Sequence, residues 1–173
     1  AAYRSAFAGA DQALASHRGS DIGALQLARQ LAKMLKVPCL AATTTRLLAD
    51  TNRSRHHPKL FSEWSGQLSK EQQERALTSY WQPHRERVHA AIEAHIQNGH
   101  TVVHLGVHSF TSNFEGSVRE IDAAWLYDPS RRLESQQVAA WRKALSDRDP
   151  TLRLRRNAPY RGTSDGLTTH LRK

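Results

Sequence analysis

His108 is the first residue whose type and place in the sequence indicate chemistry. It follows the apolar run VVHLGV at residues 102–107, which is typical of a strand buried on at least one face. Because α/β proteins place functional groups at strand ends, the His108 imidazole could be a metal ligand or a general base. The alternative is a packed histidine with a structural role. His104, four residues earlier, should point to the same face as His108.

The segment SHRGSD holds a second candidate pair, His17 and Asp21, which stand four residues apart around Gly19. An imidazole and a carboxylate are both zinc ligands, so the pair could offer two donors to a metal ion. The same letters also fit a turn followed by a helix N-cap, a position that Asp favours. The local sequence leaves both interpretations open.

A third candidate combines Arg46 with the segment Asp50-Thr51-Asn52-Arg53. Adjacent Asn and Arg side chains supply a neutral donor and a planar cationic fork, which together suit a carboxylate group. Asp50 could hold an arginine in place. The alternative is a charged turn, because Asp and Asn are common in turns.

Helices must position several of these residues. Apolar residues recur at helical spacing across residues 21–36, with Asp21 in the N-cap position. The pattern Ser69-Lys70-Glu71-Gln72 is typical of a capping box and predicts a long helical stretch to about His95. Pro83 must kink or split that stretch, because proline lacks an amide hydrogen.

Strands are predicted between and after these helices, as short apolar or alternating runs bounded by turn residues. The predicted strands are residues 37–42, 45–50, 102–108, 123–127 and 151–155, and the other predicted helices are residues 134–145 and the segment after Ser164-Asp165-Gly166. The alternation of helices and strands predicts a layered α/β fold.

Composition narrows the classes of protein. The 173 residues fit one domain, and a hydrophobic fraction of 39% is enough for a core. No apolar run approaches the roughly 18 residues of a membrane span, and the first residues lack the apolar region of a signal peptide, so we expect a cytoplasmic protein. The single cysteine, Cys39, excludes an internal disulfide. A net charge of +9 fits an anion-binding protein or simply an arginine-rich composition.

Taken in order, the motifs of the chain resemble the N-formylglutamate amidohydrolase family. The resemblance covers nearly the whole sequence and runs through SHRGSDIGALQLA, TTRLLADTNRS, YWQPHRERV, HLGVHSFTS, WLYDPSRRLE and RRNAPYRGTSDGLTTHLRK. That family is similar in fold to the zinc carboxypeptidases. The resemblance therefore implies a three-layer αβα sandwich around a mixed sheet, of the phosphorylase/hydrolase-like kind.

The resemblance also implies roles for individual residues. Asp50-Thr51-Asn52-Arg53 looks like the D-x-N-R segment whose Asn and Arg hold a substrate carboxylate, which assigns Asn52 and Arg53 to substrate binding. His108-Ser109-Phe110 looks like the H-S-aromatic segment whose His is the last zinc ligand. We prefer Asp21 to His17 as the candidate second ligand beside His108. The zinc would polarise the formyl carbonyl and lower the pKa of its bound water to about 7.

Two further residues are candidates near the substrate. Arg46 could stabilise the oxyanion or a second carboxylate. Tyr160, in the turn before Gly162, could close over the substrate.

The family's remaining catalytic parts do not match any segment here. Its early His-containing motif should give the first zinc ligand, and its final strand should give a glutamate as general base. We therefore expect residues 1–173 to be a single amidohydrolase domain that lacks the family's first and last strands.

The sequence leads to two functional hypotheses. The first is zinc-dependent hydrolysis of N-formylglutamate or a similar acidic N-acyl amino acid, a small-molecule substrate, without a membrane partner. The alternative is a non-catalytic basic module on the same fold, which binds nucleic acid or an acidic partner.

Overall fold

A computed structural model describes residues 3–114 and 116–173 of the chain, which divides into two compact units. Unit 1 comprises the residues up to Phe110 together with Asp165–Lys173, and unit 2 comprises Thr111–Ser164. The C-terminal segment thus belongs with the N-terminal two thirds of the chain. The single-domain expectation stays a prediction.

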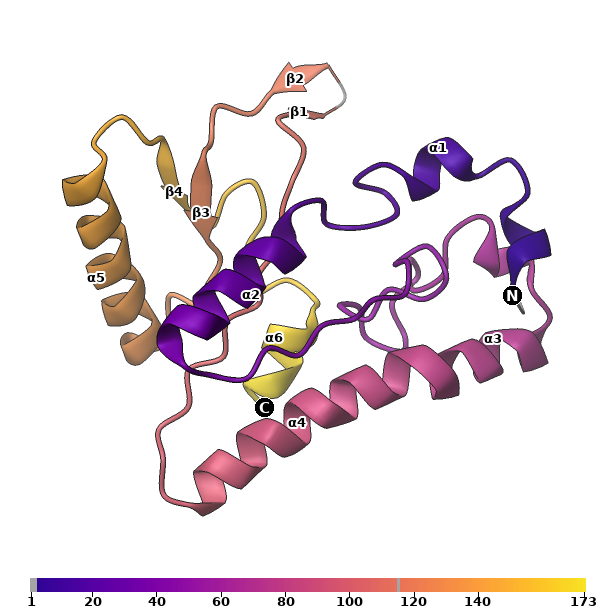
Figure 1. Ribbon diagram of the computed structural model, residues 1–173, viewed down its shortest axis with the longest axis horizontal. Helices are drawn as coiled ribbons and strands as arrows, with labels where there is room; N and C mark the ends of the chain where they lie inside the picture. The colour runs from indigo at the N-terminus through magenta and orange to yellow at the C-terminus, as the bar shows by residue number, and fades with distance from the viewer. Residues whose placement is uncertain (1–2, 115) are drawn as a thin grey trace. The chain divides into compact units, whose positions relative to one another are not determined.

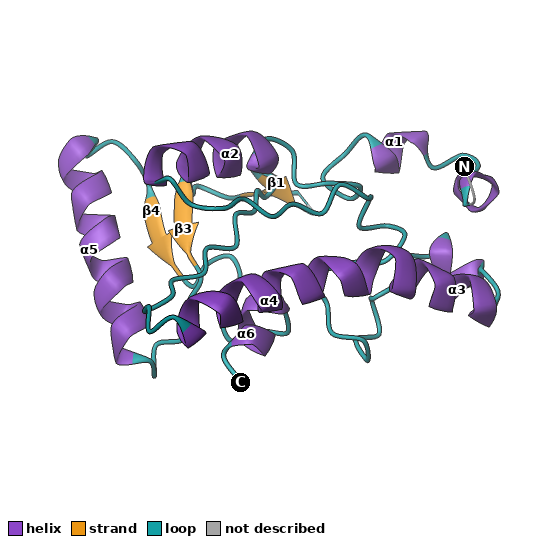
Figure 2. Cartoon of the chain, turned by 60° about the horizontal axis from the view of Figure 1, so that its bottom comes forward, coloured by secondary structure: helices purple, strands orange, loops and turns teal. Residues whose placement is uncertain are grey.

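Unit 1 is built from helices and long connecting loops (Figures 1 and 2). Two short 3-10 helices supplement its α-helices at Arg4–Phe7 and Ser65–Gln67. The α-helices are α1 (Asp11–Leu14), α2 (Ala24–Leu35), α3 (Lys70–Ala76), α4 (Gln82–Gln97) and α6 (Leu167–Leu171).

Helix α2 confirms the helix expected over residues 21–36, but its start differs from the prediction. The N-cap is Gly23, whose φ of +82° is left-handed, and no side chain caps the helix. Asp21 is therefore not the N-cap, because its carboxylate is engaged by His108 and Arg46 instead.

Helices α3 and α4 form one long helical run (Figure 1). The predicted capping box is confirmed, with Ser69 Oγ accepting from Gln72 N–H and the Gln72 side chain accepting from Ser69 N–H. The expected interruption at Pro83 takes the form of a π-helical turn at Leu77–Trp81, directly before α4. This wider turn lets Pro83 enter α4 at its beginning, where a missing amide hydrogen costs least.

The core of unit 1 contains Ala49, Leu60 and Leu77, with Phe61 and Trp81 packed against it. Ala49 lies in the segment 45–50, which was expected to be a strand and is a turn instead. An apolar run of this length is buried in either case, so its pattern does not distinguish the two structures.

The strands expected over residues 37–42 and 102–108 are also wrong, because neither segment forms regular secondary structure. A strand requires a neighbour that pairs with its backbone groups. In the part of the chain that is described, the only strand pairs lie in unit 2. Val103 and Leu105 are accordingly exposed.

The described residues of unit 2 form two small sheets and one long helix. β1 (Asn113–Phe114) and β2 (Ser117–Val118) form an antiparallel pair, and β3 (Ala123–Trp125) pairs in parallel with β4 (Leu154–Arg156). Helix α5 (Arg132–Arg148) connects β3 to β4, as Figure 2 shows. The strands expected at 123–127 and 151–155 are thus confirmed in part, and the helix expected at 134–145 is confirmed.

The start of the parallel pair is held by an ion pair. Arg153 donates from Nε and from Nη2 to the two carboxylate oxygens of Asp122, at 3.0 and 2.8 Å. The hydrogen bonds from Arg153 lower the pKa of Asp122 to about 2.

The chain therefore has a mixed α/β fold that contains a small parallel sheet and helices. The more specific three-layer αβα sandwich around a mixed sheet stays a prediction. None of the helices in the described part of the chain is long and apolar enough to cross a membrane.

Candidate functional site

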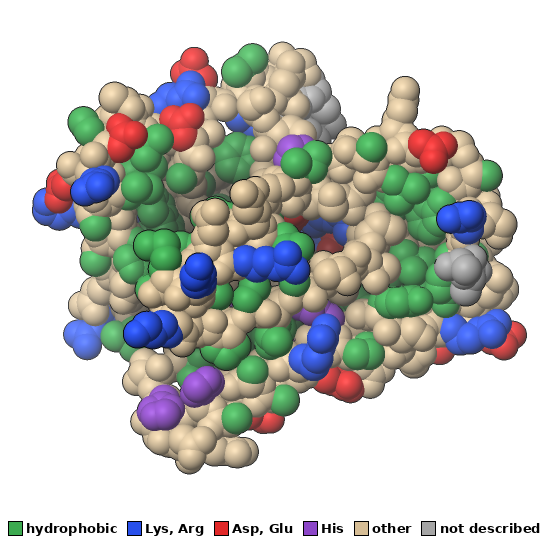
Figure 3. Space-filling model, viewed as in Figure 1, with side chains coloured by type: hydrophobic (Ala, Val, Ile, Leu, Met, Phe, Trp, Pro, Cys, Tyr) green, Lys and Arg blue, Asp and Glu red, His purple; other side chains and the backbone are tan. Residues whose placement is uncertain are grey.

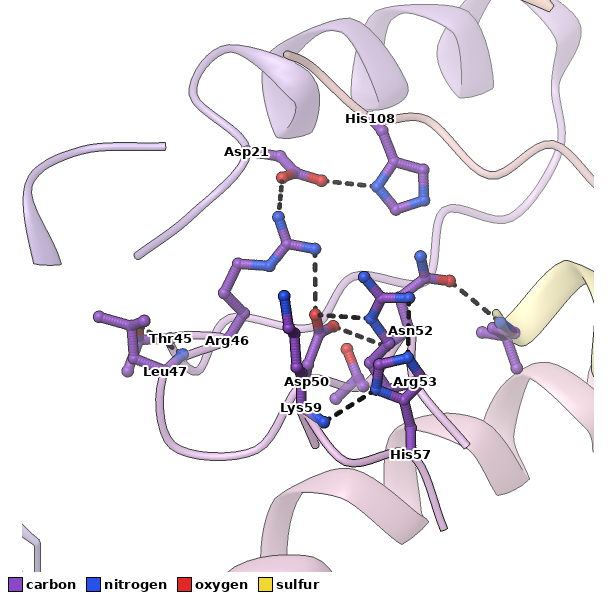
Figure 4. A network of polar contacts seen from close by, with 12 residues as sticks. Asp21, Thr45, Arg46, Leu47, Asp50, Asn52, Arg53, His57, Lys59 and His108 are labelled. Atoms are coloured by element: carbon purple, nitrogen blue, oxygen red, sulfur yellow. Dashed lines mark hydrogen bonds and ion pairs between the residues drawn. The ribbon is translucent and has the colours of Figure 1, made fainter. Parts of the chain in front are cut away.

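Asp21 belongs to a polar network in unit 1 (Figure 4). His108 Nδ1 lies 2.6 Å from Asp21 Oδ2, and Arg46 Nη1 donates to Asp21 Oδ1 at 2.9 Å. Burial raises the pKa of the Asp21 carboxyl, but the hydrogen bond from His108 and the charge of Arg46 outweigh it and leave the pKa below its ordinary value. Asp21 is therefore ionised at neutral pH. The structure brings together two of the predicted site residues that are far apart in sequence.

Arg46 lies between two carboxylates. Its Nη2 donates to Asp50 Oδ2 at 3.2 Å, while Nη1 contacts Asp21. Arg53 also lies near Asp50, with its Nε 3.9 Å from Asp50 Oδ2. The result is a line of alternating charge from Asp21 through Arg46 and Asp50 to Arg53, which Figure 4 shows side by side.

The loop that carries Asp21 is tied to the turn that carries Arg46. The carbonyl oxygen of Gly19 accepts from Arg46 N–H at 3.1 Å and from Thr45 Oγ1 at 2.8 Å. Gly19 itself has no room for a side chain, because an added Cβ would lie 2.2 Å from the carbonyl oxygen of Leu14. The sequence indicated a turn at this glycine but not its contact with residue 46.

One of the two polar atoms of the Asn52 side chain, Oδ1, makes a hydrogen bond. Its Oδ1 accepts a hydrogen bond from Leu167 N–H at 3.0 Å, at the beginning of α6. Its backbone N–H donates to Asp50 Oδ1 at 3.0 Å, the turn contact expected of Asp in such a segment. Nδ2 makes no hydrogen bond to the residues that the structure describes, so it is available as a donor. The contact with Leu167 was not foreseen from the sequence.

Arg53 and its neighbours complete the turn. Arg53 Nη1 lies 3.4 Å from Nε2 of His57, a half-buried histidine. Ser54 N–H donates to Asp165 Oδ2 at 3.0 Å. The side chain of Arg53 is 34% exposed, so its guanidinium is open to a ligand.

Two other predicted residues lie apart from this network. His104 does not accompany His108 in it, although the sequence indicated a common face. Its Nδ1 lies 3.5 Å from Thr168 Oγ1, and burial, followed by the nearby charge of His108, lowers the pKa of His104. His17 makes no contact with the network beyond its charge interaction with Asp21.

Tyr160 belongs to unit 2, where it is half-exposed and forms contacts of its own. Arg119 Nη1 donates to Tyr160 Oη at 3.3 Å, and the Arg119 guanidinium lies 5.4 Å from the centre of the ring. Asn157 Oδ1 accepts from the N–H groups of Tyr127 and Gly162, which orders the turn that presents Tyr160.

The donor set fits part of a zinc site. A carboxylate and an imidazole, both zinc ligands, meet at Asp21 and His108. A catalytic zinc ion is normally held by three protein ligands. Within residues 3–114 and 116–173, no group of three or more His, Cys, Asp or Glu side chains is arranged to hold a metal ion. The pair therefore offers two of the donors that such a site requires.

Comparison with known proteins adds two findings. A family model described as N-formylglutamate amidohydrolase matches residues 1–173. The crystal structure of gene product Atu2144 from Agrobacterium tumefaciens is similar, with a TM-score of 0.74 and 26% sequence identity over 92% of this chain. The chain spans 65% of the length of that protein. A search of curated proteins found no match.

Proposed function

The chain belongs to the N-formylglutamate amidohydrolase family, and from this premise we propose that it hydrolyses the amide of N-formylglutamate or of a similar acidic N-acyl amino acid. The products from N-formylglutamate are formate and glutamate. One observation carries the proposal: the Asp21–His108 pair is joined through Arg46 and Asp50 to the turn that bears Asn52 and Arg53.

Asn52 and Arg53 are proposed to bind the substrate carboxylate. Asn52 Oδ1 is occupied by Leu167 N–H, so the amide presents Nδ2 as a donor. The partly exposed guanidinium of Arg53 follows directly in the chain and can donate two parallel hydrogen bonds. A neutral donor beside a planar cation suits the carboxylate of an acidic amino acid.

Asp21 and His108 would hold a zinc ion together with a further ligand. A bound zinc ion would polarise the substrate carbonyl and lower the pKa of its bound water. Asp21 suits this role because its lowered pKa keeps it deprotonated, as a metal ligand must be. Arg46 holds the other Asp21 oxygen, which fixes the direction of the carboxylate.

Arg46 and Tyr160 have further proposed roles. The positive charge of Arg46 would favour negative charge as it develops on the substrate oxygen. Tyr160 is proposed, from the family resemblance, to close over the substrate. A cytoplasmic location is also part of this proposal.

Elemental analysis of zinc tests the metal site directly. We expect about one zinc ion per chain in the wild type and a large loss in both His108→Ala and Asp21→Ala. His100→Ala is the matched control, since His100 is an exposed histidine that contacts His95. Retention of zinc by the His108 variant would exclude that residue as a ligand. Hydrolysis of N-formylglutamate that a chelator abolishes and zinc restores would support the reaction.

The distribution of charge gives little support to a nucleic-acid-binding module. Many arginines pair with acidic side chains, among them Arg18, Arg55 and Arg153. On the face shown in Figure 3, basic side chains are interspersed with acidic ones. A nucleic-acid surface normally presents a continuous basic patch. Affinity for nucleic acid that fell steeply with salt would favour this alternative over hydrolysis.

A further inference from the structure

The motif YWQPHRERV has no part in the proposed chemistry, yet it contains an unusual buried cation. Arg85, in α4, is only 8% exposed, and its guanidinium lies 4.7 Å from the centre of the Trp81 ring. It forms no ion pair within residues 3–114 and 116–173. Because removing a guanidinium from water is costly, a buried arginine needs compensating contacts.

The compensating contacts are with the turn that carries Asn52. Arg85 Nη1 donates to the carbonyl oxygen of Thr51 at 3.0 Å and lies 3.4 Å from that of Arg53. Trp81 Nε1 donates to the same Arg53 carbonyl at 3.1 Å. The carbonyl groups on both sides of Asn52 are therefore held from one helix.

The π-helical turn brings the two side chains together. Trp81 is the last residue of that turn and Arg85 follows four residues later in α4, so both lie on one face of the helix. The face is directed at the turn 51–53, because both side chains end on its carbonyl oxygens.

A second set of contacts holds the same turn through α6 and the short segment before it. Leu167 N–H donates to Asn52 Oδ1, and Asp165 accepts from Ser54 N–H, each at 3.0 Å. The backbone is thus fixed by Arg85 and Trp81, while the Asn52 amide is fixed by Leu167.

We propose that Arg85 is a positioning residue, which with Trp81 orders the turn 51–53 and so aims Asn52 and Arg53 at the substrate carboxylate. The inference rests on the proposed carboxylate-binding function. Arginine suits this task better than lysine, because its planar group can stack on Trp81 while it donates to carbonyl groups. A displacement of about 1 Å in such a binding group can cost about 100-fold in rate.

Substrate analogues that differ only in the carboxylate test this role. We would measure binding of N-formylglutamate and of its neutral diamide, by calorimetry, to the full chain and to Arg85→Met. The expected result is about 10- to 100-fold weaker binding of N-formylglutamate with little change for the diamide. Arg85→Lys should recover part of the loss. Arg87→Met is the matched control, since Arg87 is exposed and its Nε donates to the Pro83 carbonyl of its own helix.

Equal losses for both analogues would overturn the inference, because a general structural defect would not depend on the carboxylate. Amide hydrogen exchange at Ser54 and Leu167 separates this failure from failure of the proposed function. Faster exchange at these two positions in Arg85→Met supports the ordering role even if the wild type binds no acyl-amino acid, a result that would refute the proposed function alone. Unchanged exchange overturns the ordering role.

Discussion

Replacing Asn52 by Asp separates the two roles of this side chain, which are the hydrogen bond to Leu167 and the proposed binding of a carboxylate. The substitution keeps an oxygen where Oδ1 accepts from Leu167 N–H and replaces the open Nδ2 donor by a second oxygen. The contact with α6 should therefore survive, while a donor for a substrate carboxylate is lost.

The expected magnitudes differ for stability and binding. In Asn52→Asp, the new carboxylate lies near the start of α6, a position that stabilises a helix by about 0.3–1 kcal/mol. This gain offsets its repulsion from Asp50, so the unfolding free energy of this variant should change by less than about 1 kcal/mol. Asn52→Ala removes the cap and should cost about 0.5–2 kcal/mol. Loss of a hydrogen bond to a charged group costs about 1.5–3 kcal/mol, so both variants should bind N-formylglutamate at least about 10-fold more weakly.

Denaturant unfolding and calorimetric binding measure the two effects independently. If Asn52→Asp is destabilised as much as Asn52→Ala, the contact between Oδ1 and Leu167 is not what holds this side chain. If Asn52→Asp binds N-formylglutamate as tightly as the wild type, Nδ2 is not the donor. Either result would refute the assignment of the two atoms.

Three further predictions concern stability. Gly19→Ala should lose about 1–3 kcal/mol of unfolding free energy because its Cβ would meet the Leu14 carbonyl, whereas Gly66→Ala, with open space around it, should lose little; equal losses in chemical denaturation would contradict this reasoning. Burial lowers the pKa of His84 below 6.5, so the unfolded chain binds the proton first, and unfolding free energy should fall as pH drops below about 6.5. His84→Phe should flatten that decline, and an unchanged pH profile would show that His84 does not cause it. Ser69→Ala should cost about 0.5–2 kcal/mol in thermal or chemical unfolding because the capping box is lost, and a neutral result would mean that the first turn of α3 is not held by it.

Local patterns were enough to predict the longer helices, but not the short α1. The capping box at Ser69 and the periodicity of α2 depend only on residues close together in the sequence, and both were confirmed. The segment 45–50 was predicted wrongly because Leu47, Leu48 and Ala49 are buried in a turn, and burial alone produces the same apolar run as a strand. A strand also needs a partner, which the letters of residues 102–108 do not specify.

The candidate site was predictable as a set of residues but not as an arrangement. Asn52, Arg53 and His108 were selected by motif, whereas the contacts of Asp21 join residues 25 and 87 positions away. No local pattern encodes contacts of that range. The same limit hid the bond between Asn52 and Leu167, which spans 115 positions.

Arg46 gives the site its internal geometry. Its guanidinium contacts Asp21 on one side and Asp50 on the other, so a single planar group spaces the Asp21–His108 pair from the Asn52–Arg53 turn. Under the proposed function, that spacing separates the carboxylate of the substrate from its reacting amide. Because Lys carries one ammonium group in place of the fork, it cannot make both contacts in the same directions. Substrate length and metal binding should therefore be coupled through Arg46, since a change in its position would move both halves of the site.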